Sequence, residues 1–593
     1  MALAMSAYPS FTRTTAINII HRAFKRSKMT YLDLMIYAST LLTLFFLAPK
    51  SFAQQTSAGS VLQGIRSQEL ETTLPQVIPN FGQAQVGQTS GPKAATFLAK
   101  RFVFIGNTKV SSETLNTLIA GYLNRSITFN DLKNAADLIA EYYRAQGLLV
   151  KTQIPQQDVT EGVITIEIME ASLGGILIDN KSKPVSDARV EKWIYSAIPR
   201  NTSLSLSALD RALLTLNDLP DIQVTSSLQE GGKRGETNVL LTVMDKPLAD
   251  GMVGVDNFGQ SSTGQNRATA SLNINGPLGL GEQVNVYGLY TEGTNYGRVA
   301  LTTPIGSDGL RVGINGSYLS YRVINPSFNQ LFANGTSSNG GAELTYPIIR
   351  SRPANLLLLG NYNYSNFNNN ANGGTTSQYS TSVFLGGLSG NLLDGFAGGG
   401  INTGSLIASG GTVNLNTSPS LSSDLIGPQV NGNFTKLRYA ANRLQAITSN
   451  LSAFLGVSGQ FASKNLDSSE QLYLGGPYSV RAYATGQGNA SQGNLMTFEL
   501  RQTLPMNLLL TGFYDYANVQ TYKTSYFASA PLNNTYVLQG LGSSIGWSGP
   551  LGLQIKAIWA MRTGTLPTLV TQSFNGNGGT SSNRFWLTAS LPI

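Results

Sequence analysis

The most constraining feature of this sequence is a two-residue alternation that begins near residue 250 and continues to the C-terminus. In residues 268–274, alanine, leucine and isoleucine hold the even positions, and threonine, serine and asparagine hold the odd ones. The turn 275–277 follows, and the pattern returns in 310–315 after the turn 306–309. Side chains of a strand alternate between the two faces of a sheet, so these segments predict strands with one apolar face.

The charge content indicates where such strands reside. Only 12% of the residues are charged, about half the ~25% of an average globular chain. A bilayer leaves no backbone group unpaired and excludes charge from the lipid-facing side, so alternating strands there must close into a barrel. We predict an antiparallel transmembrane β-barrel over residues 249–593. Sixteen strands would take roughly 21 residues each with connections, against the ~10 that span a membrane. A large soluble β-sandwich or β-helix is the alternative.

Residues 1–53 have the composition of an export signal rather than of a folded domain. Basic residues at 22–28 precede a largely apolar stretch of 15 residues, Leu34 to Ala48, and 51–53 offers small residues for cleavage. A transmembrane anchor is the alternative, but this stretch is shorter than the ~20 residues that a spanning helix needs. We predict a signal peptide over residues 1–53, with Met29 as a second candidate translation start.

The composition after removal of this leader excludes several classes of function. The leader holds six basic residues and one acidic residue, so the 40 basic and 32 acidic residues become 34 and 31, a net charge of +3. No polybasic run with interleaved aromatic residues remains, so we expect no nucleic-acid partner. The chain has no cysteine, and its single histidine, His21, lies in the leader. We therefore expect no metal, no cofactor and no enzymatic activity.

Two short motifs imitate enzyme signatures. Residues 542–546, Gly-Ser-Ser-Ile-Gly, have the spacing of a nucleophile elbow. An elbow requires a strand-to-helix turn and a histidine base, and the predicted mature chain offers neither. Gly232-Lys233 lacks the glycine pattern that cradles a phosphate, so no ATPase is indicated.

Residues 100–171 and 172–248 form two similar α+β units. Each opens with a short apolar strand that ends at an asparagine, Asn107 or Asn180, which sets a period of 73 residues. Each unit then predicts two helices and two further strands. Sheet edges beside a helix can accept an extended peptide, so these repeats are suited to docking another chain.

The second helix of the first unit has the clearest signals. Thr128 and Asp131 have the spacing of a capping box at its start, and Gly147 is placed to end it. Its predicted apolar face consists of Leu132, Ala135, Leu138, Ile139 and Tyr142.

Residues 54–99 connect the leader to these repeats. Ser57 to Leu74 predicts a short helix with apolar side chains at Val61, Leu62 and Ile65. The following stretch is rich in proline and glycine, which is typical of a flexible linker.

Several stretches resemble the outer-membrane transporters of two-partner secretion, the haemolysin and filamentous-haemagglutinin export type (the TpsB family). Residues 255–259, 263–264 and 276–281 are similar to the family's first hairpin, and 434–439 also resembles the family. The most specific similarity is 474–483, Leu-Gly-Gly-Pro-Tyr-Ser-Val-Arg-Ala-Tyr. It resembles the loop in which the family's Val-Arg-Gly-Tyr/Phe motif folds back into the barrel lumen.

The resemblance implies a fold for the whole mature chain. The α+β units at 100–171 and 172–248 correspond to two polypeptide-transport-associated (POTRA) domains, followed by a transmembrane barrel at 249–593. A loop near 474–493 would fold into the lumen. Residues 54–99 would supply a helix that plugs the barrel, and a linker. A disordered tail is the alternative for this segment.

The resemblance also implies a latch inside the pore. The implied latch residues are Val480, Arg481, Ala482, Tyr483, Phe513 and Asp515. Arg481 would meet Asp515 on the inner wall, because an unpaired arginine in a narrow lumen is costly and a guanidinium can bind a carboxylate bidentately. Two separately solvated charges are the alternative. Ala482 and Ala517 stand where the family has glycine, which puts any left-handed backbone there in question.

The implied function is a channel in the outer membrane of a Gram-negative-type bacterium, with its POTRA repeats in the periplasm. It would recognise and translocate a large secreted partner protein, an adhesin, haemolysin or toxin, without nucleotide hydrolysis. The other implied partners are outer-membrane lipid and the barrel assembly machinery during biogenesis. A factor that inserts other barrels is the alternative, although such factors usually carry more than two repeats. A passive porin would not explain the repeats.

Overall fold

The computed structural model describes residues 56–72, 96–199, 202, 204–233, 235–324, 331–527, 534–565, 567 and 581–593. The predicted signal peptide and most of the predicted linker lie outside these residues. Within the described part of the chain, no helix is both long and apolar enough to cross a membrane.

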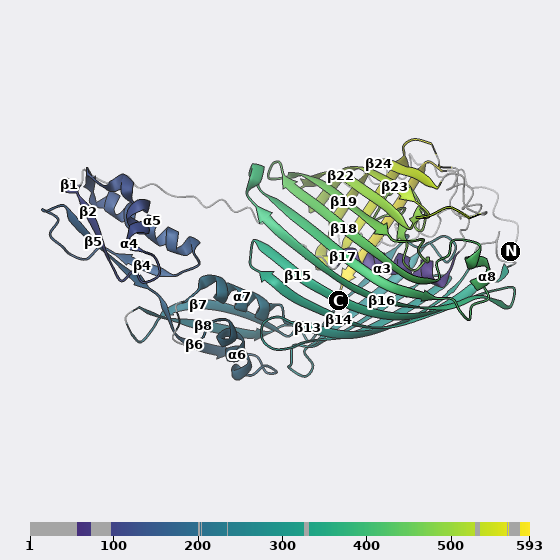
Figure 1. Cartoon of the computed structure of the whole chain (residues 1–593), viewed down its shortest axis with the longest axis horizontal. Coiled ribbons are helices and arrows are strands. Elements are labelled where there is room, and N and C mark those ends of the chain that lie inside the picture. Colours follow the sequence, from purple (N-terminus) through teal and green to yellow (C-terminus); the bar gives the residue numbers. More distant parts are fainter. Residues whose placement is uncertain are drawn as a thin grey trace, which may run out of the picture. The chain divides into compact units, whose positions relative to one another are not determined.

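The first α+β unit packs two helices against a three-stranded sheet (Figure 1). Its elements are β1 (Thr96–Ala99), β2 (Arg101–Ile105), α4 (Ser112–Leu118), η1 (Ala120–Tyr122), β3 (Arg125–Thr128), α5 (Phe129–Ala145), β4 (Val150–Gln153) and β5 (Val163–Glu170). Strand β5 is central, with β2 parallel and β4 antiparallel to it. The unit begins four residues before the predicted boundary, because β1 pairs with β3. A run of four residues was too short to be separated from the linker by pattern.

Helix α5 begins as its sequence predicts. The Thr128 hydroxyl accepts from the backbone N–H of Asp131, and the Asp131 carboxylate accepts from the backbone N–H of Thr128, which completes the capping box. The predicted apolar face is wrong at two positions: Leu138 is exposed, and Tyr143 rather than Tyr142 is fully buried. The face that packs on the sheet is therefore rotated slightly from the one that hydrophobicity alone selects.

The second unit repeats the order of the first. Its elements are β6 (Ser172–Asn180), α6 (Asp187–Ala197), α7 (Leu206–Asn217), β7 (Ile222–Glu230) and β8 (Glu236–Asp245). The two asparagines that set the 73-residue period occupy equivalent positions. The Asn107 amide donates to Val110 O and Ser112 Oγ, and the Asn180 amide donates to Val185 O and Asp187 Oδ1. Each asparagine thus ties the loop after its strand to the start of the next helix.

The described residues from 249 onward form a closed antiparallel barrel of sixteen strands, as predicted. The strands are β9 (Ala249–Asp256), β10 (Arg267–Asn275), β11 (Gln283–Tyr290), β12 (Thr294–Pro304), β13 (Arg311–Arg322), β14 (Asn334–Arg350), β15 (Ala354–Ala371), β16 (Gly374–Asp394), β17 (Gly400–Asn414), β18 (Gly432–Ala446), β19 (Leu451–Ala462), β22 (Gln492–Leu504), β23 (Leu508–Gln520), β24 (Thr535–Ser548), β25 (Gln554–Arg562) and β26 (Asn583–Pro592). Pairing of β26 with β9, from Thr588 opposite Asp256 to Pro592 opposite Met252, closes the barrel.

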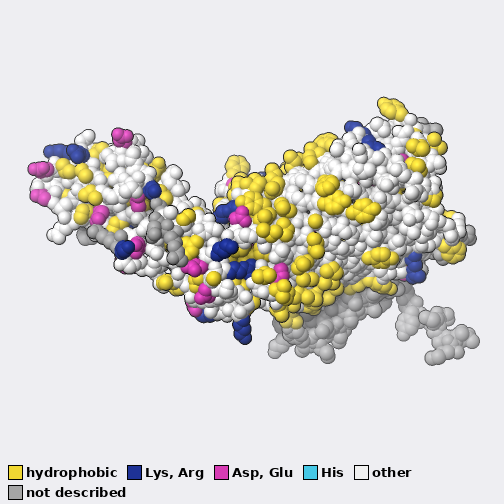
Figure 2. All heavy atoms as spheres, turned by 60° about the horizontal axis from the view of Figure 1, so that its bottom comes forward, with side chains coloured by type: hydrophobic (Ala, Val, Ile, Leu, Met, Phe, Trp, Pro, Cys, Tyr) yellow, Lys and Arg dark blue, Asp and Glu magenta, His cyan; other side chains and the backbone are white. Residues whose placement is uncertain are grey.

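The two faces of the barrel differ in chemistry. On β15, Leu358 and Tyr364 are exposed on the outside, whereas Phe367 and Asn369, of the opposite parity, are buried inside. Figure 2 shows that few charged side chains lie on the barrel surface in view, whereas both signs of charge gather on the α+β units. An apolar, charge-poor outer face is what contact with lipid requires.

Candidate functional site

The segment between β19 and β22, residues 463–491, folds into the barrel instead of leaving it. It contains a short antiparallel hairpin of β20 (Leu472–Tyr473) and β21 (Asn489–Ala490). The predicted loop, 474–493, starts within this segment, but its last two residues belong to β22, which begins at Gln492. We refer to residues 463–491 as the inward loop.

Arg481, near the tip of the inward loop, is held by two strands of the inner wall. Its Nε and Nη2 donate to Oδ2 and Oδ1 of Asp515 on β23, at 2.8 and 2.6 Å, and its backbone N–H also donates to Asp515. Its Nη1 donates to Glu499 on β22 at 2.7 Å. The guanidinium lies 3.4 Å from the ring centroid of Phe513. Two carboxylates and an aromatic face thus surround one buried cation.

The structure brings all six sequence-derived latch residues together. Val480, Ala482, Tyr483 and Phe513 belong to one buried apolar cluster, which encloses the ion pair of Arg481 and Asp515. The two alanines that replace family glycines fit without strain. Neither Ala482 nor Ala517 has a positive φ, and Ala482 packs directly on Gly540 of β24. At both positions the backbone therefore has a conformation that alanine adopts readily.

Sequence reasoning missed two partners of Arg481. Glu499 is the second carboxylate, and it also accepts from Arg501 at 2.7 Å. Trp586, on the last strand, donates from Nε1 to the backbone carbonyl of Arg481 at 2.8 Å. Glu499 alternates with outward-facing Phe498 and Leu500, so its inward direction is visible in the sequence. The register that places it beside the loop is not.

Phe258, in the first-hairpin motif, connects the inward loop to the closing strands. Its ring makes edge contacts with Tyr478 of the loop and Trp586 of β26, and its carbonyl accepts from Thr485 of the loop. Beside it, Arg267 and Asp256 form a buried ion pair at 2.7 Å. The loop is thereby joined to strands on both sides of the barrel closure.

A second buried ion pair holds the inward loop nearer its start. Lys436 of β18 lies in the motif 434–439, and its Nζ is 2.5 Å from Glu470 Oε2 and 3.0 Å from Glu470 O. Gln460 of β19 donates to the same carbonyl and accepts from Arg438. This part of the wall therefore presents two cations to one carboxylate of the loop.

Helix α3 (Ala58–Thr72) lies within the barrel against β13, β14 and β15 (Figure 1). It is buried on several sides at once, and its fully buried positions are Ala58, Gly59, Ser60, Val61, Leu62, Gln63 and Ile65. The backbone N–H of Ala58 donates to Asn369 of β15 at 2.8 Å. Ser57 Oγ contacts Ser468 Oγ of the inward loop at 2.8 Å. All these partners are uncharged.

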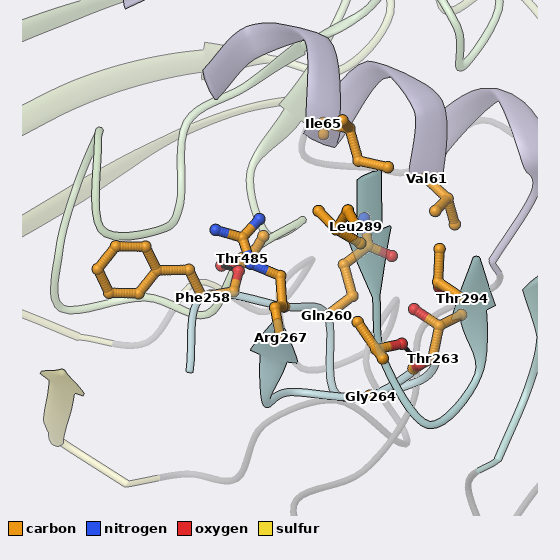
Figure 3. A pocket seen from close by; sticks show the side chains of 13 residues that line it. Val61, Ile65, Phe258, Gln260, Thr263, Gly264, Arg267, Leu289, Thr294 and Thr485 are labelled. Carbon is orange, nitrogen blue, oxygen red and sulfur yellow. Dashed lines mark hydrogen bonds between the residues drawn. The ribbon is translucent and has the colours of Figure 1, made fainter. Parts of the chain in front are cut away.

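A small cavity separates α3 from the wall. Val61, Gly64 and Ile65 line it on the helix side, facing Leu289 and Arg267 among the wall residues (Figure 3). Its volume of about 30 Å³ is enough for a water molecule or two. The helix is thus enclosed but not tightly packed along this side.

Among the described residues, no group of acidic or histidine side chains is arranged to hold a metal ion. The Gly-x-Ser-x-Gly motif lies within strand β24, so it has no strand-to-helix turn.

Comparison with known proteins identifies this architecture. Residues 235–549, more than half of the chain, match the haemolysin secretion/activation protein family ShlB/FhaC/HecB, and residues 97–171 match the POTRA domain of ShlB type. The chain belongs to this family. It is therefore an outer-membrane transporter of two-partner secretion, with POTRA domains in the periplasm, and the predicted family, fold, function and location are confirmed.

The individual relatives are distant. The heme/hemopexin transporter protein HuxB of Haemophilus influenzae (strain 86-028NP) is 28% identical over 74% of this chain and 79% of its own. The structure of CdiB from Escherichia coli covers 92% of this chain and 100% of its own with a TM-score of 0.67 at 19% identity. BamA from Haemophilus ducreyi, lacking POTRA domains 1–3, covers 84% of this chain and 100% of its own with a TM-score of 0.51 at 14% identity. These two likenesses concern the fold alone.

Proposed function

We propose that this transporter exports one large secreted partner protein, which docks on the POTRA domains and then passes unfolded through the lumen. Helix α3 is the plug of the resting channel. The linker that follows it within residues 54–99 allows it to leave. The observation that carries this proposal is the burial of α3 inside a closed barrel by uncharged contacts. No nucleotide hydrolysis or other catalysis takes part, and folding of the partner outside the cell supplies the driving force.

The second POTRA domain offers an exposed sheet edge for docking. In the second unit the sheet order is β6-β8-β7, so β7 is an edge strand. Residues 225–230 of β7 are exposed on both faces. An extended segment of the partner can pair with such an edge as an added strand. The relative HuxB is named a heme/hemopexin transporter, and we propose a secreted adhesin, haemolysin or toxin as the cargo of this chain.

Arg481 and Asp515 act as the latch that keeps the inward loop in the pore. The bidentate pair with Asp515 and the second carboxylate, that of Glu499, support this role. Moving the guanidinium away from both would leave buried charges without their partners, which is costly. Outer-membrane lipid surrounds the barrel, and the barrel assembly machinery inserts it.

Planar-bilayer conductance tests the proposal. We expect the mature protein to give a small, flickering conductance, and the variant lacking residues 54–95, which keeps strand β1, to give a large, steady one. Equal conductance in both would remove the plug from the mechanism. Folded protein without any channel would contradict the export function and favour a role in inserting other barrels. Docking is then tested by adding the N-terminal domain of a secreted partner protein to the full-length channel.

A further inference from the structure

The plug helix rests on one turn of the inward loop, residues 467–471, which we call the seat. Ser57 contacts Ser468 through the hydroxyls, and Gln63 Nε2 donates to the backbone carbonyl of Gln471 at 3.2 Å. Between these contacts Gly59 lies so close to the seat that an added Cβ would be 2.8 Å from Ser468 Oγ. The position of α3 therefore depends on the position of the seat.

The seat is fixed to the wall at both ends. At its start, Asp467 Oδ1 accepts from Tyr379 of β16 and from Ser469. At its end, Glu470 forms the buried ion pair with Lys436. Since the Asp467 oxygen is already engaged by neutral donors, Glu470 is the group of the seat that faces the wall cations.

Two cations of the wall lie beside Glu470, and a third cation, Arg66, lies on the plug helix. Lys436 and Arg438 alternate with Leu437 on β18 and point into the lumen. Arg66 of α3 lies close enough to act electrostatically on Lys436. Counted as formal charges, these three cations and one carboxylate sum to +2, and loss of the carboxylate raises the sum to +3. Like charges in a confined site of low dielectric repel strongly.

We propose that Glu470 is the positioning residue that retains the plug, by neutralising the wall cations Lys436 and Arg438, which would otherwise repel Arg66 of α3. This inference rests on the proposed role of α3 as the plug. Removal of the carboxylate leaves the helix facing uncompensated positive charge, and the helix leaves the lumen. The latch at Arg481, near the tip of the loop, is separate from this ion pair and stays closed.

Substitutions that change the local charge distinguish an electrostatic role of Glu470 from a purely structural role. Glu470→Gln raises the local charge to +3, and we expect the channel to occupy the large conductance state at least about tenfold more often. A tenfold change in population corresponds to ~1.4 kcal/mol. Adding Arg66→Gln or Lys436→Met returns the charge to +2, so both double variants should be closed like the wild type. A structural role predicts that Lys436→Met with Glu470→Gln is as open as Glu470→Gln.

Two further measurements complete the test. Because the chain has no cysteine, Ala58→Cys in each background reports exit of the helix through labelling by a membrane-impermeant maleimide. Asp394→Asn is the control, since Asp394 also pairs with one cation of the wall, Arg443, and its hydrogen-bond partners among the described residues belong to neither loop nor plug. Heat-dependent migration on gels verifies a folded barrel. Should Glu470→Gln not fold, Gln63→Lys adds the same charge on the helix and is expected to open the channel.

The outcomes distinguish a failure of the proposed role of Glu470 from a failure of the proposed plug function of α3. An open Glu470→Gln channel that either second substitution closes supports the inference. A closed Glu470→Gln channel, or double variants that remain open, overturns it while leaving the plug in place. If deletion of residues 54–95 does not change the conductance, the plug itself is refuted, and with it the proposed function of α3.

Discussion

Two elements occupy the lumen of this barrel, the inward loop and helix α3, and they are held in different ways. The tip of the loop is fixed by Arg481, which makes charge-assisted bonds to two buried carboxylates. The helix is fixed by single neutral hydrogen bonds, such as that of Ala58 with Asn369, and it borders a cavity. Charge-assisted hydrogen bonds are roughly twice as strong as neutral ones.

This difference indicates which element moves. A neutral hydrogen bond contributes only about 1 kcal/mol net, so a docking partner can offset the few that hold α3. Extracting Arg481 would leave Asp515 buried without a cation and Glu499 with Arg501 as its remaining partner, which is far more costly. The inward loop is therefore expected to stay in the lumen, and helix α3 is expected to leave it.

The largest expected effect tests the occupant that stays. Arg481→Ala leaves two buried carboxylates without their shared cation, and removal of one partner of a buried pair costs about 3–5 kcal/mol. We expect a lower thermal unfolding temperature for the purified protein and loss of partner export from cells. Arg443→Ala is the matched control. It removes an arginine from its more exposed pair with Asp394 and should lower the unfolding temperature much less, because solvent screens this pair.

Equal destabilisation by Arg481→Ala and Arg443→Ala would break the comparison. The loop would then be held by its apolar cluster, and the ion pair would be incidental.

A smaller effect tests the occupant that leaves, through two glycines of the same helix. An added Cβ at Gly59 would meet Ser468 and Tyr379 at 2.8 and 2.9 Å, whereas at Gly64 it would approach only Gln260, at 3.4 Å beside the cavity. Alanine favours a helix over glycine by up to ~1 kcal/mol, and overpacking costs about 1–3 kcal/mol. Gly64→Ala should therefore stabilise the plugged state, and Gly59→Ala should destabilise it.

Single-channel recording reads both variants directly. We expect fewer openings for Gly64→Ala and more for Gly59→Ala than for wild type. A shift in the same direction for both would mean that helix propensity, rather than fit in the lumen, sets the stability of the plug.

The barrel could be predicted because alternation is a local signal. Residues 268–274 reveal an apolar and a polar face without knowledge of any neighbour, and β10 has those faces. The α+β repeats were equally local, since the capping box of Thr128 and the asparagines at 107 and 180 lie beside the helices that they organise.

The charge network of the lumen could not be predicted in the same way. Arg481 and Asp515 were paired only through the family resemblance, and Glu499, Trp586 and the Lys436–Glu470 pair were missed. Each of these contacts depends on the register between distant strands and on the path of the inward loop. Neither can be predicted from the sequence of a single segment. The sequence specifies which side chains face inward, but the closed barrel decides which of them meet.

The smallest effect is expected for a carboxylate outside the barrel. Like Asp515 in the latch, it accepts several hydrogen bonds, but it is in contact with water. In the first POTRA domain, Glu170 accepts from the backbone N–H groups of Thr108 and Lys109 and from the Tyr143 hydroxyl. Partial burial acts to raise the pKa of Glu170, but these hydrogen bonds outweigh it and the pKa is lowered. The stabilisation is therefore present above the unfolded pKa of ~4.3 and lost as the pH falls through the folded value.

Glu170→Gln should destabilise the turn 107–110 by about 1 kcal/mol or less at pH 7, because solvent screens a carboxylate that is largely exposed. Hydrogen exchange of this peptide in the full chain, corrected for the intrinsic rate, measures the effect. The difference between wild type and variant should stay constant above about pH 4.3 and shrink as the pH falls below it. A loss as large as that of Arg481→Ala would show that the strength of the latch does not come from its burial in the lumen. The contrast between the loop and the helix would then need another cause.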